Sequence, residues 1–301
     1  MHSSTVLPNK ICGGALISSR RKRCLVTAAG TKPKKSLGQN FLANPDILQK
    51  IADAAKLSPK HAVLEVGPGT GNLTRCLLAT GASVTAVEKD RRLIKRLSAE
   101  FPQVNIIEAD ILTYDLPSCL DRMIQKQGES GASRVTVVGN LPYYITQDFL
   151  RQLLPLGHLV SHAVLLLQEE AALRLTQTVP GASDFRAMSI ETQYYSQATP
   201  LFTVSRTEFS PVPDVNGLVA EFALHLPEDR AVSDAQGFLA MVRQAFSMKR
   251  KMLRNCLQPC YSVSQIDMAM SAARLDAHVR PQQMSLEDYV LLYDGLHAHM
   301  H

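Results

Sequence analysis

The chain has 301 residues, of which 46% are apolar, and this suits one sizeable domain with a smaller one. The mean hydropathy is −0.03 and no apolar stretch is long enough to span a bilayer, so we expect a soluble protein without a membrane partner. The net charge of +5 mildly favours a polyanionic partner, although much of the excess lies near the N-terminus.

The N-terminal segment is basic and lacks acidic residues. No Asp or Glu precedes Asp46, whereas Lys and Arg are frequent and Ser and Thr are scattered among them. This composition is typical of an organelle transit peptide, so residues 1–33 are predicted to be a disordered transit peptide. The composition leaves one alternative open, which is a basic arm that grips RNA.

Strand-like apolar runs alternate with helical patterns along most of the chain. These runs lie near residues 62–67, 83–88, 104–109, 134–139, 162–168, 189–195 and 217–225. The last two follow each other without a long helix between them, which indicates an antiparallel hairpin at a sheet edge. The pattern predicts an α/β fold with a doubly wound, Rossmann-like, seven-stranded sheet. After residue 227, apolar residues at helical spacing from Phe238 to Phe246 indicate a small α-helical domain.

A glycine-rich turn follows the first of these strands, in the segment from Val63 to Asn72. Such a turn lets the backbone approach a ligand closely. The spacing is G-x-G-x-G, and Asn72 stands where a dinucleotide-binding turn has its third glycine. A ligand without phosphates therefore fits better, such as the amino-acid end of S-adenosylmethionine, although a simple tight turn remains the alternative.

The next two strands end in acidic residues. Glu88 lies about twenty residues after the glycine turn, where an acid can accept hydrogen bonds from both ribose hydroxyls of a nucleoside cofactor. Asp110 ends the following strand and is placed to meet an adenine amine. Each acid alone could be a solvated strand end, but the carboxyl ends of parallel strands meet at one edge of a sheet.

The segment Asn140-Leu141-Pro142-Tyr143 closes the fourth apolar run. The Asn140 side-chain oxygen and the Leu141 carbonyl can accept hydrogen bonds from the exocyclic amine of a planar base, while Pro142 fixes the turn. Tyr143 offers a face on which the base can stack. A proline turn after a buried strand is the simpler alternative.

The six cysteines have no spacing that resembles a zinc site. We expect them to be reduced thiols in a reducing compartment, and we predict no metal ion in the chemistry.

With these segments the sequence resembles the rRNA adenine N6,N6-dimethyltransferases, which modify two adjacent adenosines near the 3′ end of small-subunit rRNA. The resemblance runs from about residue 34 into the C-terminal helices, and two of its segments are similar to the plastid branch. The matching segments are Lys35–Leu42, Val63–Asn72, Asn140–Thr146, Leu167–Ala171, Phe209–Pro213 and Lys249–Asn255.

The resemblance implies a class I methyltransferase domain over residues 34–226, an rRNA-binding helical domain over 227–301 and S-adenosylmethionine as cofactor. The cofactor-binding residues that it implies are Asn40, Leu42, Gly67, Gly69, Glu88, Asp110 and Asn140. The catalytic residues that it implies are Asn140, Leu141, Pro142 and Tyr143, with Phe209 as a second stacking ring.

The resemblance also implies partners and a location. Lys249, Arg250, Lys251 and Arg254 are expected to bind rRNA phosphates, although a solvated helix face is the alternative. We expect a monomer that acts on small-subunit rRNA within a pre-ribosomal particle, in organelle ribosome biogenesis. The expected location is the chloroplast stroma, with the mitochondrion as the alternative.

The expected reaction is direct displacement, in which the adenine N6 nitrogen attacks the sulfonium methyl group of the cofactor. Three other functions remain open. These are a large-subunit rRNA methyltransferase of the antibiotic-resistance type, an RNA-binding ribosome-assembly or organelle transcription factor that retains the fold, and a dehydrogenase, which the missing third glycine disfavours.

Overall fold

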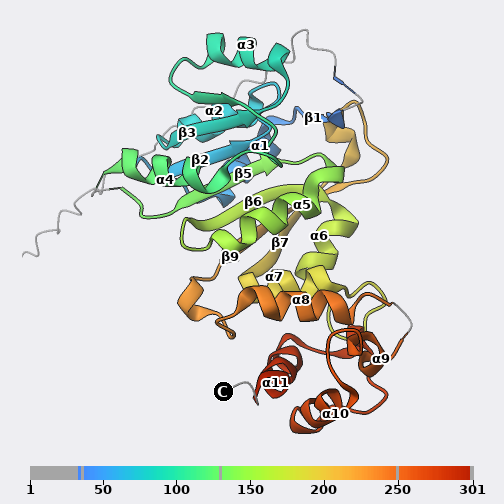
Figure 1. The fold of residues 1–301 in the computed structure, drawn as a ribbon. Helices are drawn as coiled ribbons and strands as arrows, with labels where there is room; N and C mark the ends of the chain where they lie inside the picture. The colour runs from blue at the N-terminus through green and yellow to red at the C-terminus, as the bar shows by residue number, and fades with distance from the viewer. Residues whose placement is uncertain (1–32, 35–36, 129–130, 249–250, 299–301) are drawn as a thin grey trace, which may run out of the picture.

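A seven-stranded sheet forms the centre of the computed structural model, with helices on both of its faces (Figure 1). The structure describes residues 33–34, 37–128, 131–248 and 251–298, so almost all of the predicted transit peptide lies outside the described residues. The strand order is β4-β3-β2-β5-β6-β9-β7, in which β9 pairs antiparallel with β6 and β7 and the other neighbouring strands pair in parallel. The predicted doubly wound α/β sheet is confirmed.

The strands of the large sheet have the following bounds: β2 (Ala62–Val66), β3 (Ser83–Glu88), β4 (Asn105–Glu108), β5 (Val135–Asn140), β6 (Val160–Gln168), β7 (Ser196–Val204) and β9 (Gly217–Leu224). A second, small sheet pairs β1 (Phe41–Leu42) with β8 (Phe209–Ser210). This small sheet joins the N-terminal part of the described chain to the segment that follows β7.

Two hydrophobic cores lie on opposite faces of the large sheet. Helices α1 (Pro45–Ala54), α2 (Asn72–Ala79) and α3 (Arg91–Glu100) pack on one face. Helices α4 (Leu116–Gln127), α5 (Thr146–Leu153) and α7 (Ala187–Tyr195) pack on the other. Successive residues of β2 enter the two cores in turn, since Val63 belongs to the first and Leu64 to the second. A strand buried on both faces needs a nearly continuous apolar run, which the sequence supplies.

The chain reverses its direction of travel across the sheet between β2 and β5. From β2 it proceeds outward through β3 to β4, and it then returns to place β5 and β6 on the other side of β2. Strands β2 and β5 are parallel neighbours in which Val66 lies opposite Gly139. Gly67 and Asn140 therefore emerge side by side at the reversal point, where open α/β sheets bind their ligands.

The prediction of a strand over residues 189–195 is wrong, because this segment belongs to helix α7. The Ser189 hydroxyl accepts a hydrogen bond from the Arg186 backbone N–H and caps the start of the helix. The edge strand of the hairpin is the next segment, β7, which pairs antiparallel with β9. Pro200 weakens the strand pattern of β7 in the sequence, but an edge strand tolerates it, and the register shifts between Pro200 and Phe202.

Helices follow the last strand of the sheet: α8 (Ala235–Ala245), α9 (Leu253–Leu257), α10 (Val263–Ala272) and α11 (Leu286–His297). These helices lie on the side of the sheet where α7 is found, and α8 is next to α7 (Figure 1). Phe238 of α8 packs on Tyr194 of α7, and their ring centroids are 5.0 Å apart. The terminal helices and the sheet share one hydrophobic core, so the predicted boundary at residue 227 stays a prediction. No helix within the described ranges is long and apolar enough to cross a membrane.

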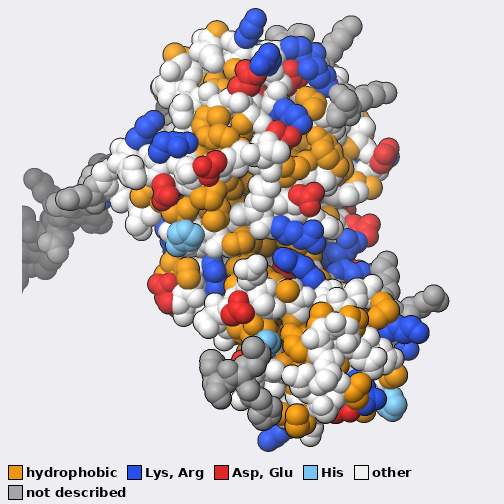
Figure 2. All heavy atoms as spheres, in the orientation of Figure 1, with side chains coloured by type: hydrophobic (Ala, Val, Ile, Leu, Met, Phe, Trp, Pro, Cys, Tyr) orange, Lys and Arg blue, Asp and Glu red, His pale blue; other side chains and the backbone are white. Residues whose placement is uncertain are grey.

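One buried carboxylate connects α5, α7 and α8. Glu191 of α7 is 2% exposed, and Arg243 of α8 donates to both of its oxygens, at 2.9 and 2.8 Å. Arg151 of α5 is a weaker partner, with its Nε 3.9 Å from the carboxylate. Figure 2 shows Lys and Arg side chains gathered on this side of the molecule, where the terminal helices meet the sheet domain.

Replacing Arg243 should therefore destabilise the fold. Arg243→Ala leaves the buried Glu191 carboxylate without its bidentate partner, and we expect the free energy of unfolding to fall by about 3 kcal/mol. Arg151→Ala removes only the distant, half-exposed partner and should cost less than about 1 kcal/mol. Urea denaturation of both variants measures the difference, and equal effects would contradict the importance that we assign to the bidentate pair.

Candidate active site

An open cavity of about 110 Å³ lies at the carboxyl ends of β2, β3 and β5. All but one of the predicted cofactor and catalytic residues line it: Asn40, Gly67, Gly69, Glu88, Asp110, Asn140, Leu141, Pro142, Tyr143 and Phe209. Leu42 instead lines a smaller neighbouring cavity, which shares Phe41, Gly67, Gly69 and Asn140 with the first. The structure thus brings these residues together, while their individual roles stay predictions.

The glycine turn forms one wall of the cavity. Gly67 and Gly69 have positive φ angles of 68° and 58°, which side chains rarely tolerate. A Cβ atom on Gly69 would also lie 3.2 Å from the ring of Phe41. The Gly69 N–H donates to the Glu88 carboxylate at 3.2 Å, so the turn and the end of β3 hold each other in place.

Glu88 is buried, and backbone N–H groups fix its carboxylate. Besides Gly69, the N–H groups of Lys89 and Asp90 donate to it at 2.9 and 2.8 Å. Burial raises the pKa of Glu88, while these donors oppose that rise. The carboxylate is therefore oriented before any ligand arrives.

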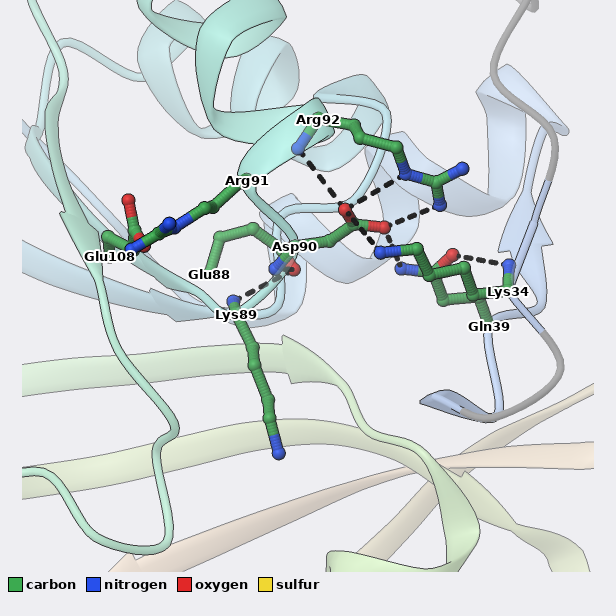
Figure 3. Close-up of polar contacts among 8 residues, drawn as sticks. All are labelled: Lys34, Gln39, Glu88, Lys89, Asp90, Arg91, Arg92 and Glu108. Atoms are coloured by element: carbon green, nitrogen blue, oxygen red, sulfur yellow. Dashed lines mark hydrogen bonds and ion pairs between the residues drawn. The ribbon is translucent and has the colours of Figure 1, made fainter.

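Asp90 ties the N-terminal strap, which we define as Lys34 together with residues 37–42, to the end of β3 (Figure 3). Its buried carboxylate accepts from Lys34 Nζ at 3.2 Å and from Gln39 Nε2 at 3.3 Å. Arg92 binds the same carboxylate through its Nε at 3.1 Å and its Nη2 at 2.7 Å. The Arg92 side chain and backbone and the two strap residues together hold the pKa of Asp90 far below its usual range.

The strap continues from this anchor across the cavity. The Asn40 carbonyl accepts from Asn140 Nδ2 at 3.1 Å, and the Leu42 carbonyl accepts from Asn72 Nδ2 at 3.0 Å. In the small sheet, Leu42 lies opposite Phe209. The strap is therefore in contact with the segments that carry the predicted cofactor-binding and base-binding residues.

The turn after β5 presents Asn140 with a fixed orientation. Because its amide nitrogen donates to Asn40, its side-chain oxygen is the atom available to accept a hydrogen bond from a ligand. The Leu141 N–H donates to the Leu166 carbonyl at 3.2 Å, which attaches the turn to β6. Tyr143 follows at the start of the short 3₁₀ helix η2 (Tyr143–Ile145), and burial raises its pKa.

Asp110 is already paired at the rim of the cavity. Lys89 Nζ donates to one of its oxygens at 2.7 Å, and the Leu112 N–H donates to the other at 3.1 Å. The Lys89 ammonium group lowers the pKa of Asp110. An adenine amine that binds Asp110 would share the carboxylate with Lys89 or displace it.

Sequence reasoning missed Glu65, which belongs to β2 and lies two residues before Gly67. It is 1% exposed and lines the smaller cavity, and within the described residues neither carboxylate oxygen makes a hydrogen bond of normal geometry. Burial raises the pKa of Glu65 to about 8 and the nearby Glu88 carboxylate adds to the rise, while weak donors on the Thr74 hydroxyl and backbone oppose it. An acid between two apolar residues of a strand is the sequence signal that could have identified it, since charged residues are rarely fully buried without a partner.

Of the predicted phosphate-binding residues, Lys251 and Arg254 are described, and neither lines the cavity. Lys249 and Arg250 are outside the described residues. Lys251 is exposed, and Arg254 Nη2 is paired with Asp267 at 2.6 Å. The structure thus leaves the predicted phosphate-binding role of this cluster untested.

Comparison with known proteins shows the family of this chain. The sequence model of the ribosomal RNA adenine dimethylase family matches residues 30–297. This chain belongs to that family. The predicted enzyme class and cofactor are confirmed: the protein is an rRNA adenine dimethyltransferase that uses S-adenosylmethionine.

Two relatives show the extent of the match. A protein named "Ribosomal RNA small subunit methyltransferase, chloroplastic" from Arabidopsis thaliana is 37% identical over 275 residues, which are 89% of this chain and 80% of that protein. "Ribosomal RNA small subunit methyltransferase A" from Protochlamydia amoebophila is 36% identical and covers 92% of this chain and 95% of its own length.

Solved structures confirm the class I methyltransferase fold. A dimethyladenosine transferase from Plasmodium falciparum superimposes with a TM-score of 0.66 at 23% identity, over 84% of this chain and 95% of that one. The 23S rRNA methyltransferase ErmE gives a TM-score of 0.64 at 24% identity, over 85% and 99% of the two chains. At these identities the likeness concerns the fold alone.

The raised pKa of Glu65 should make the free energy of unfolding depend on pH. In the unfolded chain the pKa of Glu65 is near 4.5, whereas in the folded protein it is about 8. Between these values the folded protein binds more protons, so its free energy of unfolding should fall as the pH rises, by up to about 1.4 kcal/mol per pH unit.

The glutamine side chain of Glu65→Gln does not titrate, so the free energy of unfolding of this variant should fall less steeply as the pH rises. Urea denaturation without cofactor at about pH 5 and about pH 7.5 measures the slope. Glu170→Gln is the control, because Glu170 is an exposed partner of Arg174 and should leave the slope unchanged. An unaltered slope in Glu65→Gln would show that Glu65 is ionised in the folded protein.

Loosening the strap should weaken cofactor binding. The double variant Lys34→Met and Gln39→Leu removes both strap contacts to Asp90, and we expect the Kd for S-adenosylmethionine to rise about tenfold. Arg92→Met removes a partner of Asp90 that does not contact the strap, so its Kd should stay within about twofold of the wild-type value. Titration calorimetry gives both constants, and an equal Kd for the double variant and the wild type would contradict the role of the anchor.

Proposed function

We propose that this protein methylates N6 of two adjacent adenosines near the 3′ end of small-subunit rRNA, as part of organelle ribosome biogenesis. The observation that carries the proposal is that one cavity is lined by both Glu88 and the segment Asn140–Tyr143. The first suits a nucleoside cofactor and the second suits a planar base with an exocyclic amine. The chloroplastic relative from Arabidopsis thaliana supports the choice of the small subunit and of an organelle.

The buried polar groups of the site fit S-adenosylmethionine. Glu65 makes no hydrogen bond of normal geometry among the described residues, and a buried carboxyl group is stabilised by a cation such as the cofactor's ammonium group. Glu88 would accept from the ribose hydroxyls, and Asp110 would accept from the adenine amine. Asn40, Leu42, Gly67, Gly69 and Asn140 would complete the site. The bound cofactor supplies an electrophilic methyl group on a sulfonium.

Asn140 and Leu141 would prepare the target amine for attack. The amine is a weak nucleophile because its lone pair is delocalised into the ring. Hydrogen bonds to the Asn140 side-chain oxygen and the Leu141 carbonyl orient the amine and localise the lone pair, so positioning supplies most of the rate enhancement. Water can accept the proton that the nitrogen loses after transfer.

Tyr143 and Phe209 would hold the target base outside the RNA stack. Removing a base from its stack costs a few kcal/mol. Stacking on an aromatic ring returns about 1–3 kcal/mol per base, which offsets this cost. Pro142 fixes the turn on which Tyr143 is placed.

The remainder of the chain would position the RNA. We propose a methyltransferase domain over residues 34–226 and an rRNA-binding helical domain over 227–301, in which Lys249, Arg250, Lys251 and Arg254 neutralise phosphates. Such contacts fix orientation without reading the sequence. A monomer would act on a pre-ribosomal particle in the chloroplast stroma, after a transit peptide at residues 1–33 has directed it there. The mitochondrion is the alternative location.

The test is incubation with labelled S-adenosylmethionine and unmethylated small ribosomal subunits, followed by mapping of dimethyladenosine. In that assay Asn140→Ala should lower kcat by about 100-fold or more, because the amine loses its orienting acceptor. Subunit binding should be nearly unchanged.

Asn105→Ala is the matched control, because Asn105 is an exposed residue at the opposite end of the sheet and should leave kcat unchanged. Near-normal turnover by Asn140→Ala would remove Asn140 from the mechanism. Failure of the wild-type protein to form dimethyladenosine in small subunits would overturn the proposed function itself.

A further inference from the structure

Tyr144 is an exposed aromatic residue at the mouth of the cavity. It is 62% exposed, whereas Tyr143 before it is half-buried and Ile145 after it is buried. All three residues belong to η2 and line the cavity. Isolated exposed apolar side chains are common on protein surfaces, so the position of Tyr144 matters more than its exposure.

The strap supports the Tyr144 ring from one side. Gly38 has a positive φ of 59°, and a Cβ atom there would lie 3.2 Å from Cε1 of Tyr144 and 3.4 Å from Cβ of Pro142. The absence of a side chain at Gly38 therefore lets the ring lie against the strap backbone. The ring is held at the cavity mouth while most of its surface remains open to solvent.

A cation lies at the same rim. Lys89 Nζ lies 2.7 Å from an Asp110 carboxylate oxygen, and the Lys89 side chain is about half exposed. The negative charge of Asp110 and, to a smaller extent, Tyr144 raise the pKa of Lys89. The cavity mouth thus combines an exposed aromatic ring with a lysine, which is the pair of features that binds single-stranded nucleic acid without reading its sequence.

We propose that Tyr144 forms a second base-binding subsite, which stacks the nucleobase next to the target adenine while Lys89 faces the phosphate that joins them. This proposal rests on the proposed function. When one adenine enters the pocket at Tyr143, its neighbour also loses a stacking partner. Tyr144 follows Tyr143 directly, with their Cα atoms about 3.8 Å apart, so its ring is an exposed aromatic surface next to the proposed stacking face for the target base.

The subsite has a consequence for two adjacent targets. While the first adenosine is methylated, the second is held unstacked at the mouth of the same cavity. Because the two positions are related by a shift of one nucleotide, the second base can enter the pocket without a new unstacking step. Loss of Tyr144 should therefore impair RNA binding more than cofactor binding.

Two variants test the subsite. Tyr144→Ala removes the ring, and we expect the KM for unmethylated small subunits to rise about tenfold, with the Kd for S-adenosylmethionine unchanged. Tyr144→Phe keeps the ring without the hydroxyl and should stay within about twofold of the wild-type KM. Val179→Ala removes part of a similarly exposed apolar side chain that lies outside both the cavity lining and residues 227–301, and it should change neither constant.

A fluorescence measurement tests stacking independently of turnover. The probe is a short RNA with two adjacent adenosines, in which 2-aminopurine replaces one or the other. With the wild-type protein and Tyr144→Phe, we expect quenching of the 2-aminopurine beside the target adenine, and with Tyr144→Ala we expect that quenching to be lost.

The outcomes separate the two proposals. If the wild-type protein methylates small subunits while Tyr144→Ala keeps the wild-type KM and quenching, the subsite is wrong and the proposed function stands. If Tyr144→Phe fails as Tyr144→Ala does, the hydroxyl is essential and a stacking role is overturned. If the wild-type protein does not methylate small subunits, the proposed function fails, whatever the probe shows.

Discussion

The parallel pairing of β2 with β5 is the constraint on which the rest of the site depends. Since β3 and β4 lie on one side of this pair and β6 on the other, the chain reverses here, and the carboxyl ends of both strands open into the same cavity. Val66 lies opposite Gly139, which places the glycine turn beside Asn140. A shift of this register by one residue would turn each strand's side chains to the opposite core and separate the two segments.

The sheet alone does not complete the site, because one side of the cavity comes from the N-terminal strap. The strap is connected to the sheet at Asp90, at Asn140 and through the pairing of β1 with β8. Asp90 is also bound through its backbone N–H to Glu88, so one residue touches both the strap and the buried carboxylate. This connection couples the position of the strap to the orientation of the Glu88 carboxylate, which is the proposed ribose-binding group.

The sequence predicts the parts of the site that follow from strand order. Glu88, Asp110 and Asn140 each end or follow a strand, and parallel strands bring such residues to one edge. It could not predict the partners of these residues, because the contact between Lys34 and Asp90 joins segments 56 positions apart. The strand predicted at 189–195 failed for a related reason. The burial of Glu191 against Arg243 favours α7, and this contact depends on a helix some fifty residues later.

Three acidic residues near this edge of the sheet differ in how many donors surround them. Asp90 has a lysine, an arginine and an amide, and its pKa is far below its usual range. Glu88 has only backbone N–H groups, and its pKa is raised by burial. Glu65 has only weak donors from Thr74 and makes no hydrogen bond of normal geometry among the described residues, and burial raises its pKa to about 8. The number of donors around the carboxyl group therefore falls from the strap toward the interior of the cavity. A ligand with a cationic end and a neutral diol matches that order, since its ammonium group would meet the least satisfied carboxyl and its hydroxyls the partly satisfied one.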